Sequence, residues 1–181
     1  MKRRILFFVF YGVVFSILLV IALYDYKHKI IPDELVYVFI FLSIVKLGIF
    51  FLCNHNISPG SLSMENVMNS LSPFVVAFPF YFLWVISNGK WLGFGDVKLA
   101  FGIGALLGFV SGVSAVVLAF WIGALVGIFL ILRGKFSLDP AKKLEMGSEV
   151  PFAPFLILAT FIVFFTRIDV LSIKTWLSLV N

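Results

Sequence analysis

The chain has 181 residues, of which 62% are hydrophobic, 13% are charged and 23 are phenylalanine. A soluble domain of this size could not bury so much apolar surface, so the composition excludes an ordinary soluble globular protein. The formal net charge of +5 sits mostly in the polar segments between apolar runs, where Lys and Arg influence membrane orientation. We therefore expect no nucleic-acid partner.

Six apolar runs follow one another along the chain and indicate membrane-crossing helices. A hydrocarbon core about 30 Å thick requires roughly 20 helical residues, and the sequence lacks the alternating pattern of a transmembrane barrel. The sequence predicts an all-α, polytopic membrane bundle of about six transmembrane helices, forming a single domain over residues 1–181. The spans are expected near Ile5–Tyr24, Leu35–Cys53, Val67–Ile86, Val97–Phe109, Val113–Leu132 and Val150–Thr166.

The chain offers few residues for metal or disulfide chemistry. Cys53 is the only cysteine, which excludes an internal disulfide and a cysteine-based zinc site. His28 and His55 each stand alone and are expected to be solvated. We predict neither a metal nor another cofactor. Lys46 lies inside the second apolar run, and its ammonium group is expected to reach toward the membrane interface opposite the start of that run.

Small residues recur at a spacing of four, at Gly104, Gly108 and Gly112 and again at Gly123 and Gly127. In a membrane this spacing lets helix backbones approach closely. We expect tight packing within one chain, and the seam of a homodimer is the alternative. The segment from Gly108 to Gly112 also offers a turn between the fourth and fifth spans.

Asp25 closes the first apolar run, where it is expected at the C-terminal end of a helix. The helix dipole opposes an anion there, so an acidic group in this place is a candidate for proton chemistry. The alternative is a solvated helix end at which Asp25 pairs with Lys27 or Lys29. By contrast, Pro32 and Asp33 suit the first turn of the next helix, and this structural role is sufficient to explain Asp33.

Asp96 follows Gly93 and Gly95 and precedes Lys98 at the start of another apolar stretch. The two glycines allow unusual backbone dihedral angles and a close approach to another segment. An ordinary helix N-cap is the alternative explanation for Asp96. Because two complete crossings separate Asp25 from Asp96, we expect both carboxylates on the same side of the membrane.

Two carboxylates that meet cannot readily both ionise, so one retains a proton. The ionised carboxylate can then take a proton from water while the other protonates or hydrogen-bonds the scissile carbonyl. The sequence therefore predicts general acid–base peptide hydrolysis without a covalent intermediate. No constellation of a serine or cysteine nucleophile with histidine competes with this interpretation.

Three motifs in this order resemble the type IV prepilin peptidase family across nearly the whole chain. They are Asp25 followed by Pro32-Asp33, the run from Gly93 to Lys98, and the run from Val150 to Leu156. The resemblance implies a six-span membrane aspartyl endopeptidase in which Asp25 and Asp96 are the catalytic pair. It also implies supporting roles for the remaining motif positions, Pro32, Asp33, Gly93, Gly95, Lys98, Pro151 and Pro154. Ala153 departs from the glycine that many bacterial members carry at that position.

The same resemblance implies a substrate and a location. Members of the family remove a basic leader from prepilins or pseudopilins at the cytoplasmic face of the cell membrane, in contact with membrane lipid. Because the chain begins directly at the first protease span, we expect peptidase activity without the methyltransferase activity of larger bacterial enzymes. Six spans with Asp25 inside would place both termini and Cys53 near the outer surface, although Lys2, Arg3 and Arg4 favour the reverse orientation.

Three other interpretations remain open at this point. The aspartate motifs also resemble those of presenilin and signal-peptide peptidase, but the Pro-Ala-Leu element of those proteases is absent. A small proton-coupled transporter would use its carboxylates as an ion relay, yet both aspartates fall at span ends. A purely structural membrane subunit would leave Asp25 unexplained.

Overall fold

The computed structural model describes residues 2–57, 64–90, 92–135 and 151–167. Within these ranges the regular structure consists of six α-helices without a β-strand, which confirms the predicted all-α class. The helices are α1 (Lys2–His28), α2 (Asp33–Ile57), α3 (Met64–Ser87), α4 (Phe94–Leu107), α5 (Phe109–Lys135) and α6 (Ala153–Thr166).

The helices differ in length. Helices α1, α2, α3 and α5 each contain a segment long and apolar enough to cross a membrane. Helices α4 and α6 have 14 residues each, and at 1.5 Å per residue each covers only about 21 Å of a hydrocarbon core about 30 Å thick. The six expected elements are therefore present in order, but two of them are short.

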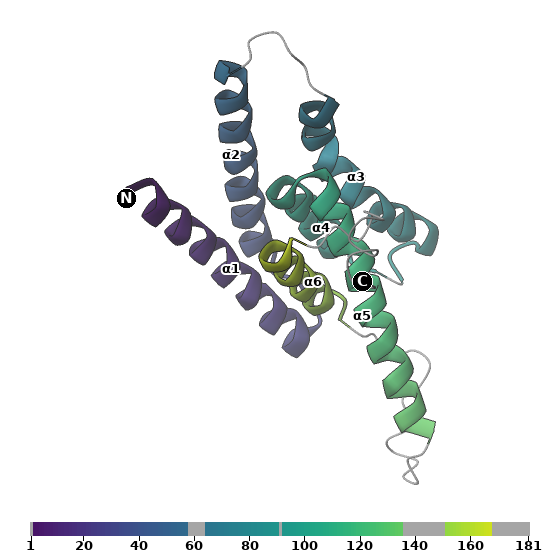
Figure 1. The fold of residues 1–181 in the computed structure, drawn as a ribbon. Coiled ribbons are helices and arrows are strands. Elements are labelled where there is room, and N and C mark those ends of the chain that lie inside the picture. The colour runs from purple at the N-terminus through teal and green to yellow at the C-terminus, as the bar shows by residue number, and fades with distance from the viewer. Residues whose placement is uncertain (1, 58–63, 91, 136–150, 168–181) are drawn as a thin grey trace, which may run out of the picture.

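Successive helices run in opposite directions, and α4 lies in the middle of the bundle (Figure 1). Helix α4 contacts α2, α3, α5 and α6, and most of its side chains are buried. The turn that ends it is a single residue, Gly108, which has a φ of 84°. Since α5 begins at Phe109, the predicted hairpin is confirmed, but its turn is tighter than the expected segment from Gly108 to Gly112.

Aromatic contacts hold α1 and α6 together. The ring centroids of Phe15 and Phe161 are 4.2 Å apart, and those of Tyr11 and Phe164 are 4.7 Å apart. Burying such large rings against one another stabilises the pair beyond the area removed from lipid or water. The many phenylalanines of the sequence thus include direct contacts between the first and last described helices.

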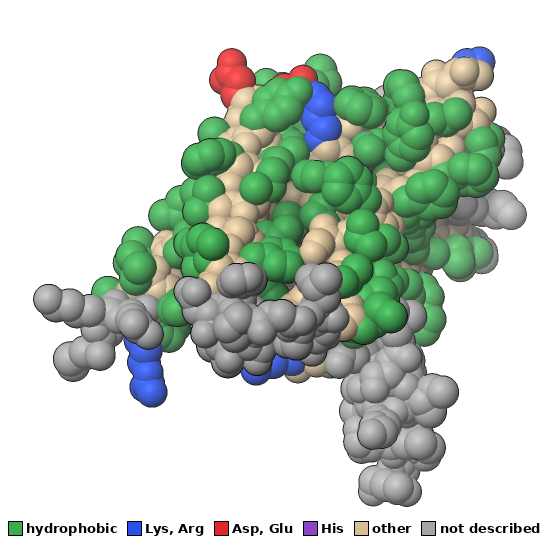
Figure 2. All heavy atoms as spheres, turned by 90° about the horizontal axis from the view of Figure 1, so that it is seen from above, with side chains coloured by type: hydrophobic (Ala, Val, Ile, Leu, Met, Phe, Trp, Pro, Cys, Tyr) green, Lys and Arg blue, Asp and Glu red, His purple; other side chains and the backbone are tan. Residues whose placement is uncertain are grey.

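The outer surface of the bundle is largely apolar. In Figure 2, hydrophobic side chains cover most of the visible face, and charged side chains lie toward its edges. Exposed apolar residues occur along the long helices, among them Phe8, Phe41, Phe74 and Leu125. A continuous apolar surface of this kind is what a lipid environment requires.

The glycines spaced four residues apart differ in how closely they are packed. A Cβ atom at Gly104 would lie 2.6 Å from the carbonyl oxygen of Ser72 and 2.8 Å from the Cα atom of Pro73, so the backbones of α4 and α3 touch. The Ser72 hydroxyl donates a hydrogen bond to the Gly104 carbonyl at 2.8 Å. By contrast, a Cβ atom at Gly127 would have no neighbour within 4 Å. Close packing within one chain is therefore confirmed for Gly104, whereas the homodimer seam stays a prediction.

Candidate active site

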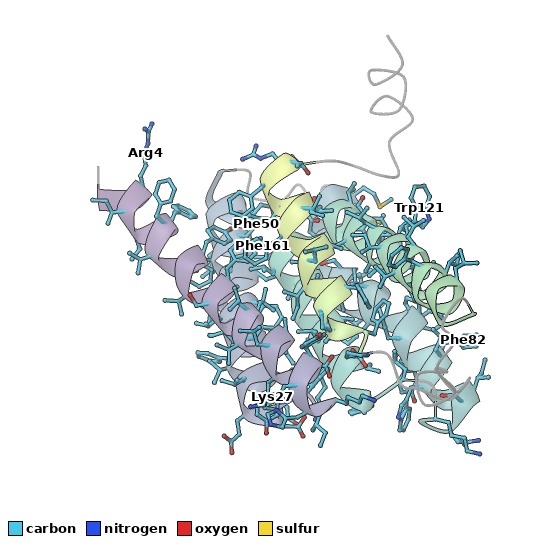
Figure 3. All side chains as sticks on the ribbon, turned by 90° about the horizontal axis from the view of Figure 1, so that it is seen from below. Arg4, Lys27, Phe50, Phe82, Trp121 and Phe161 are labelled. Carbon is cyan, nitrogen blue, oxygen red and sulfur yellow. The ribbon has the colours of Figure 1, made fainter. Side chains whose placement is uncertain are left out.

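The two aspartates lie at the same end of the bundle, hereafter the aspartate end. Asp25 belongs to the last turn of α1, near the end that Lys27 marks in Figure 3, and Asp96 belongs to the first turn of α4. Their side chains are only 5% and 7% exposed. The prediction that Asp25 and Asp96 share one end of the molecule is confirmed by their position in the fold.

Local sequence explains how each aspartate is placed. Helix α1 ends where Lys29 adopts a left-handed conformation and donates its backbone N–H to the Asp25 carbonyl at 2.7 Å. Helix α4 begins after Gly93, which occupies the N-cap position in an extended conformation. Asp96 is therefore the third residue of α4, and its backbone N–H bonds to the Gly93 carbonyl at 3.1 Å.

The carboxylates are close to one another and incompletely paired. Both line one cavity, close enough for two negative charges to repel one another. Within the described part of the chain, Oδ2 of Asp25 and Oδ1 of Asp96 are buried without a hydrogen-bond partner. Buried polar atoms are normally paired, because leaving one unpaired costs about 1–3 kcal/mol. Two such atoms at one site indicate a place built for a ligand or a reaction rather than for stability alone.

Backbone amides from two helix N-termini reach the other sides of the carboxylates. Asp25 interacts with the N–H of Ala153, and Asp96 interacts with the N–H of Gly93. Ala153 is the first residue of α6, where an N–H has no acceptor inside the helix. The positive ends of the α4 and α6 dipoles therefore both point at the aspartate pair.

These contacts exclude two structural explanations that the sequence left open for the aspartates. Asp25 is not a solvated helix end, because it is buried, and the ion pair found among the described residues joins Lys98 to Asp33 instead. Asp96 is not the N-cap of α4, because Gly93 takes that position. Asp96 instead reaches back from the third helical position to the N-cap amide, as one half of a capping box does.

A cavity of about 470 Å³ opens at the two aspartates. It is formed by the ends of α1 and α4, the segments that precede α2 and α4, and the segment that leads into α6. Its lining contains both aspartates together with the motif residues Asp33, Gly93, Gly95, Lys98 and Pro151, and also Lys29, Ile30, Ile31, Gly89, Lys90, Leu92, Phe94 and Phe152. A polar and charged opening at the end of an apolar bundle can admit water and an extended peptide.

An ion pair joins two of the motifs beside this cavity. The Lys98 ammonium lies 2.8 Å from Oδ1 of Asp33, at the start of α2. The same ammonium lies 4.8 Å from the ring centroid of Tyr37 and 5.4 Å from that of Phe94. These contacts fasten the start of α4 to the start of α2. The predicted helix-start role of Asp33 is confirmed, and the sequence had not indicated its pairing with Lys98.

The remaining motif residues have local structural positions. Gly95 lies against the segment before α2, since a Cβ atom there would be 2.9 Å from the Cβ of Ile31. Pro32 immediately precedes α2, and its carbonyl accepts the Val36 N–H at 3.2 Å. Pro154 occupies the first turn of α6, where a missing N–H costs no helical hydrogen bond. Neither proline lines the cavity.

Sequence reasoning missed two contributors to the site. The backbone of Ala153 contacts Asp25, whereas the sequence pointed only to the prolines on either side. Phe152 anchors this segment, with its ring centroid 5.1 Å from that of Phe120 and 5.6 Å from that of Phe80. The aromatic residue between the two prolines was the available signal. Within the described ranges, no group of three or more His, Cys, Asp or Glu residues could hold a metal ion.

Comparison with known proteins identifies relatives of the chain. The model of the type IV leader peptidase family matches residues 12–128. The chain is also similar to the prepilin leader peptidase/N-methyltransferase of Pectobacterium carotovorum subsp. carotovorum, with 32% identity over 137 residues. That match covers 75% of this chain and 45% of the relative, so the chain spans about half of the relative's length. No solved structure matches it. With its two aspartate motifs held together at one cavity, the chain belongs to the type IV leader peptidase family.

Proposed function

We propose that the chain is an intramembrane aspartyl endopeptidase that removes the basic leader of a type IV prepilin or pseudopilin. The observation that carries the proposal is the pair of buried aspartates, each with one unpartnered carboxylate oxygen at the same cavity. The family membership supplies the peptidase class. The expectation that the chain acts as a peptidase without methyltransferase activity stays a prediction.

The pair performs hydrolysis by dividing two proton tasks. One carboxylate stays protonated and donates a hydrogen bond to the scissile carbonyl, while the other is ionised and accepts a proton from the attacking water. The amides of Ala153 and Gly93 each interact with one of the carboxylates, and the unpartnered oxygens can bind water and substrate that enter the cavity. No side chain of the enzyme becomes covalently attached to the peptide.

The position of the cavity fits a substrate with a polar leader and an apolar helix. The cavity opens at one end of the bundle, where a leader in water can enter while the following apolar segment remains in lipid. Asp33 lies at the rim and is largely exposed, so it can meet a basic residue of the leader. Clustering of both aspartates at one end favours hydrolysis over an ion relay, which would need polar groups distributed across the membrane.

The test is cleavage of a co-expressed prepilin by Asp25→Asn and Asp96→Asn proteins. Both variants are expected to lose detectable cleavage, because an amide can neither share the proton nor activate water. Membrane accumulation should stay close to that of the wild type, since asparagine is nearly isosteric with aspartate. Cleavage is read from the change in pilin size and confirmed by N-terminal sequencing of the product.

Glu34→Gln is the matched control. Glu34 is an exposed acidic residue in the first turn of α2 and does not line the cavity, so its variant should cleave at the wild-type rate. Near wild-type cleavage by either aspartate variant would refute the proposed pair. Loss of cleavage in the Glu34→Gln control would show that the assay reports general damage rather than chemistry.

A further inference from the structure

A second cavity lies at the opposite end of the bundle, hereafter the far end. It measures about 570 Å³ and is bordered by α1, α2, α4, α5 and α6. None of the proposed catalytic residues contributes to its lining. Helices α4 and α6 end beside the cavity, at Leu107 and Thr166, whereas α1 and α2 continue past the lining residues Tyr11 and Lys46.

The cavity reaches the C-terminal end of α4. Lys46, which lines it, is separated from the far end of α2 at Ile57 by about 16 Å along the helix axis. The Lys46 ammonium donates a hydrogen bond to the Leu106 carbonyl, at the C-terminal end of α4, at 2.8 Å. The sequence had not indicated this partner at the end of α4, and the expectation that Lys46 extends toward the far interface stays a prediction.

The charged side chains in the lining are both cationic. Lys46 reaches the cavity from α2, and Arg167 reaches it from the residue that ends α6. The Arg167 backbone is left-handed, with a φ of 51°, and its N–H donates to the Val163 carbonyl at 2.9 Å. Lysine carries three donors, and the hydrogen bond to Leu106 uses one of them.

The rest of the lining combines hydroxyl groups with apolar surface. Ser111 and Tyr11 supply hydroxyls, whereas Phe164 and Phe165 supply rings. Two cations and two hydroxyl donors suit the oxygens of a phosphate group, and the adjacent rings suit an acyl chain. Cationic pockets between membrane helices are suited to anionic lipid headgroups.

We propose that the far-end cavity binds a phosphate group, carried by an anionic phospholipid whose acyl chains follow the Phe164 and Phe165 surface. Lys46 and Arg167 contact the phosphate oxygens from two different helices. The bound headgroup would fill the space left beyond the short α4. This inference does not depend on the proposed peptidase activity.

The test measures lipid retention by native mass spectrometry of the detergent-purified protein titrated with phosphatidylglycerol or phosphatidylcholine. The wild type is expected to retain one phosphatidylglycerol molecule in preference to phosphatidylcholine. Arg167→Gln and Lys46→Met should each weaken phosphatidylglycerol retention by about fivefold, the effect of losing roughly 1 kcal/mol of charge interaction. Lys46→Arg should restore retention, because it keeps the charge.

Arg4→Gln is the matched control. Arg4 is an exposed cation at the N-terminal end of α1, on the same side of the bundle, and it lies outside the cavity lining. Its variant should retain phosphatidylglycerol as the wild type does. Equal retention of the two lipids by the wild type, or equal losses in Arg4→Gln and Arg167→Gln, would overturn the proposal.

Competition by inorganic phosphate separates the two sources of the ligand. A lipid site should keep its phosphatidylglycerol in millimolar phosphate. Inorganic phosphate would replace only the headgroup contacts, and the contacts of the acyl chains would be lost. Complete displacement by inorganic phosphate, with the same dependence on Arg167, would assign the cavity to free phosphate and overturn the lipid part of the proposal. Because Lys46→Met also removes a contact to α4, Arg167→Gln carries the decision if the Lys46 variant unfolds.

Discussion

Individual residues at the aspartate end divide into those proposed to react and those that hold other residues in place. Asp25 and Asp96 are buried and incompletely paired, whereas Asp33 is 59% exposed and pairs with Lys98 through one carboxylate oxygen. An exposed ion pair contributes about 0–1 kcal/mol, because water and salt screen it. Three aspartates line the same cavity, but we expect substitution of Asp33 to affect cleavage much less than substitution of Asp25 or Asp96.

This difference predicts the behaviour of Asp33→Asn. Removing the charge weakens the link between α2 and α4 but leaves both buried aspartates in place, so cleavage should fall by less than about tenfold. The measurement is the initial rate of prepilin cleavage in membranes at equal enzyme content. A loss as complete as that of Asp96→Asn would contradict this view and assign Asp33 a direct part in the reaction.

The sequence predicted which residues form the site and what chemistry they could perform, but not how deeply they are buried or which backbone groups contact them. Two apolar crossings between Asp25 and Asp96 determine that they share one end, which span counting captures. Their burial could not be predicted, because it depends on how the start of α6 packs against the ends of α1 and α4. The contact of Ala153 with Asp25 is made by a backbone amide, so it could not be predicted from the identity of the side chains.

Among the helices, α4 is the element on which the others pack. Its glycines allow it to approach α3 so closely that the Ser72 carbonyl nearly touches the Gly104 backbone. The hydrogen bond from the Ser72 hydroxyl to the Gly104 carbonyl reinforces this approach. Because Asp96 sits at the start of the same helix, packing along α4 also positions the proposed reactive carboxylate.

Gly104→Ala should therefore destabilise the bundle. The new methyl group would meet backbone atoms of α3 that cannot rotate away, and overpacking of this kind costs about 1–3 kcal/mol. The measurement is the thermal unfolding midpoint in detergent, which should fall by several degrees. Gly127→Ala is the control, since a Cβ atom there would have no neighbour within 4 Å. An unchanged midpoint for Gly104→Ala would mean that α3 and α4 are less tightly packed than described.

The helix order was also predictable, whereas helix ends were less so. Apolar runs marked all six elements, because transfer to lipid depends on composition alone. The start of α4 at Phe94 instead of Val97, and its end at the single residue Gly108, depend on backbone geometry at glycines. Hydropathy does not report such geometry, so the expected span Val97–Phe109 had nearly the right length but not the right ends.

The molecule as a whole has two chemically different ends. One end holds the paired aspartates, and the other holds the cavity lined by Lys46 and Arg167. The proposed activity requires the aspartate end to face the cytoplasm, where a basic leader would be found. The N-terminus of α1 and the C-terminal end of α6 each lie one crossing away from the aspartate end, so we predict both on the outer side. The weak charge bias of the loops does not decide this orientation.

Single cysteines test this orientation in a Cys53→Ser background. Tyr26→Cys reports on the aspartate end and Met64→Cys on the far end, and the original side chains are 74% and 76% exposed. In intact cells, a membrane-impermeant maleimide should label the protein carrying Met64→Cys and spare the one carrying Tyr26→Cys. Both should react after permeabilisation. Labelling of only the Tyr26→Cys protein in intact cells would reverse the proposed orientation.

The shortness of α4 links this protein to the physical thickness of its surroundings. A helix that covers about 21 Å cannot match a hydrocarbon layer about 30 Å deep, and α4 is enclosed by neighbouring helices instead of lipid. Because α4 starts at the aspartate end, the missing length of about 9 Å falls at the far end, beyond Gly108. The far-end cavity is therefore the part of the molecule whose surroundings we expect to change most with acyl-chain length.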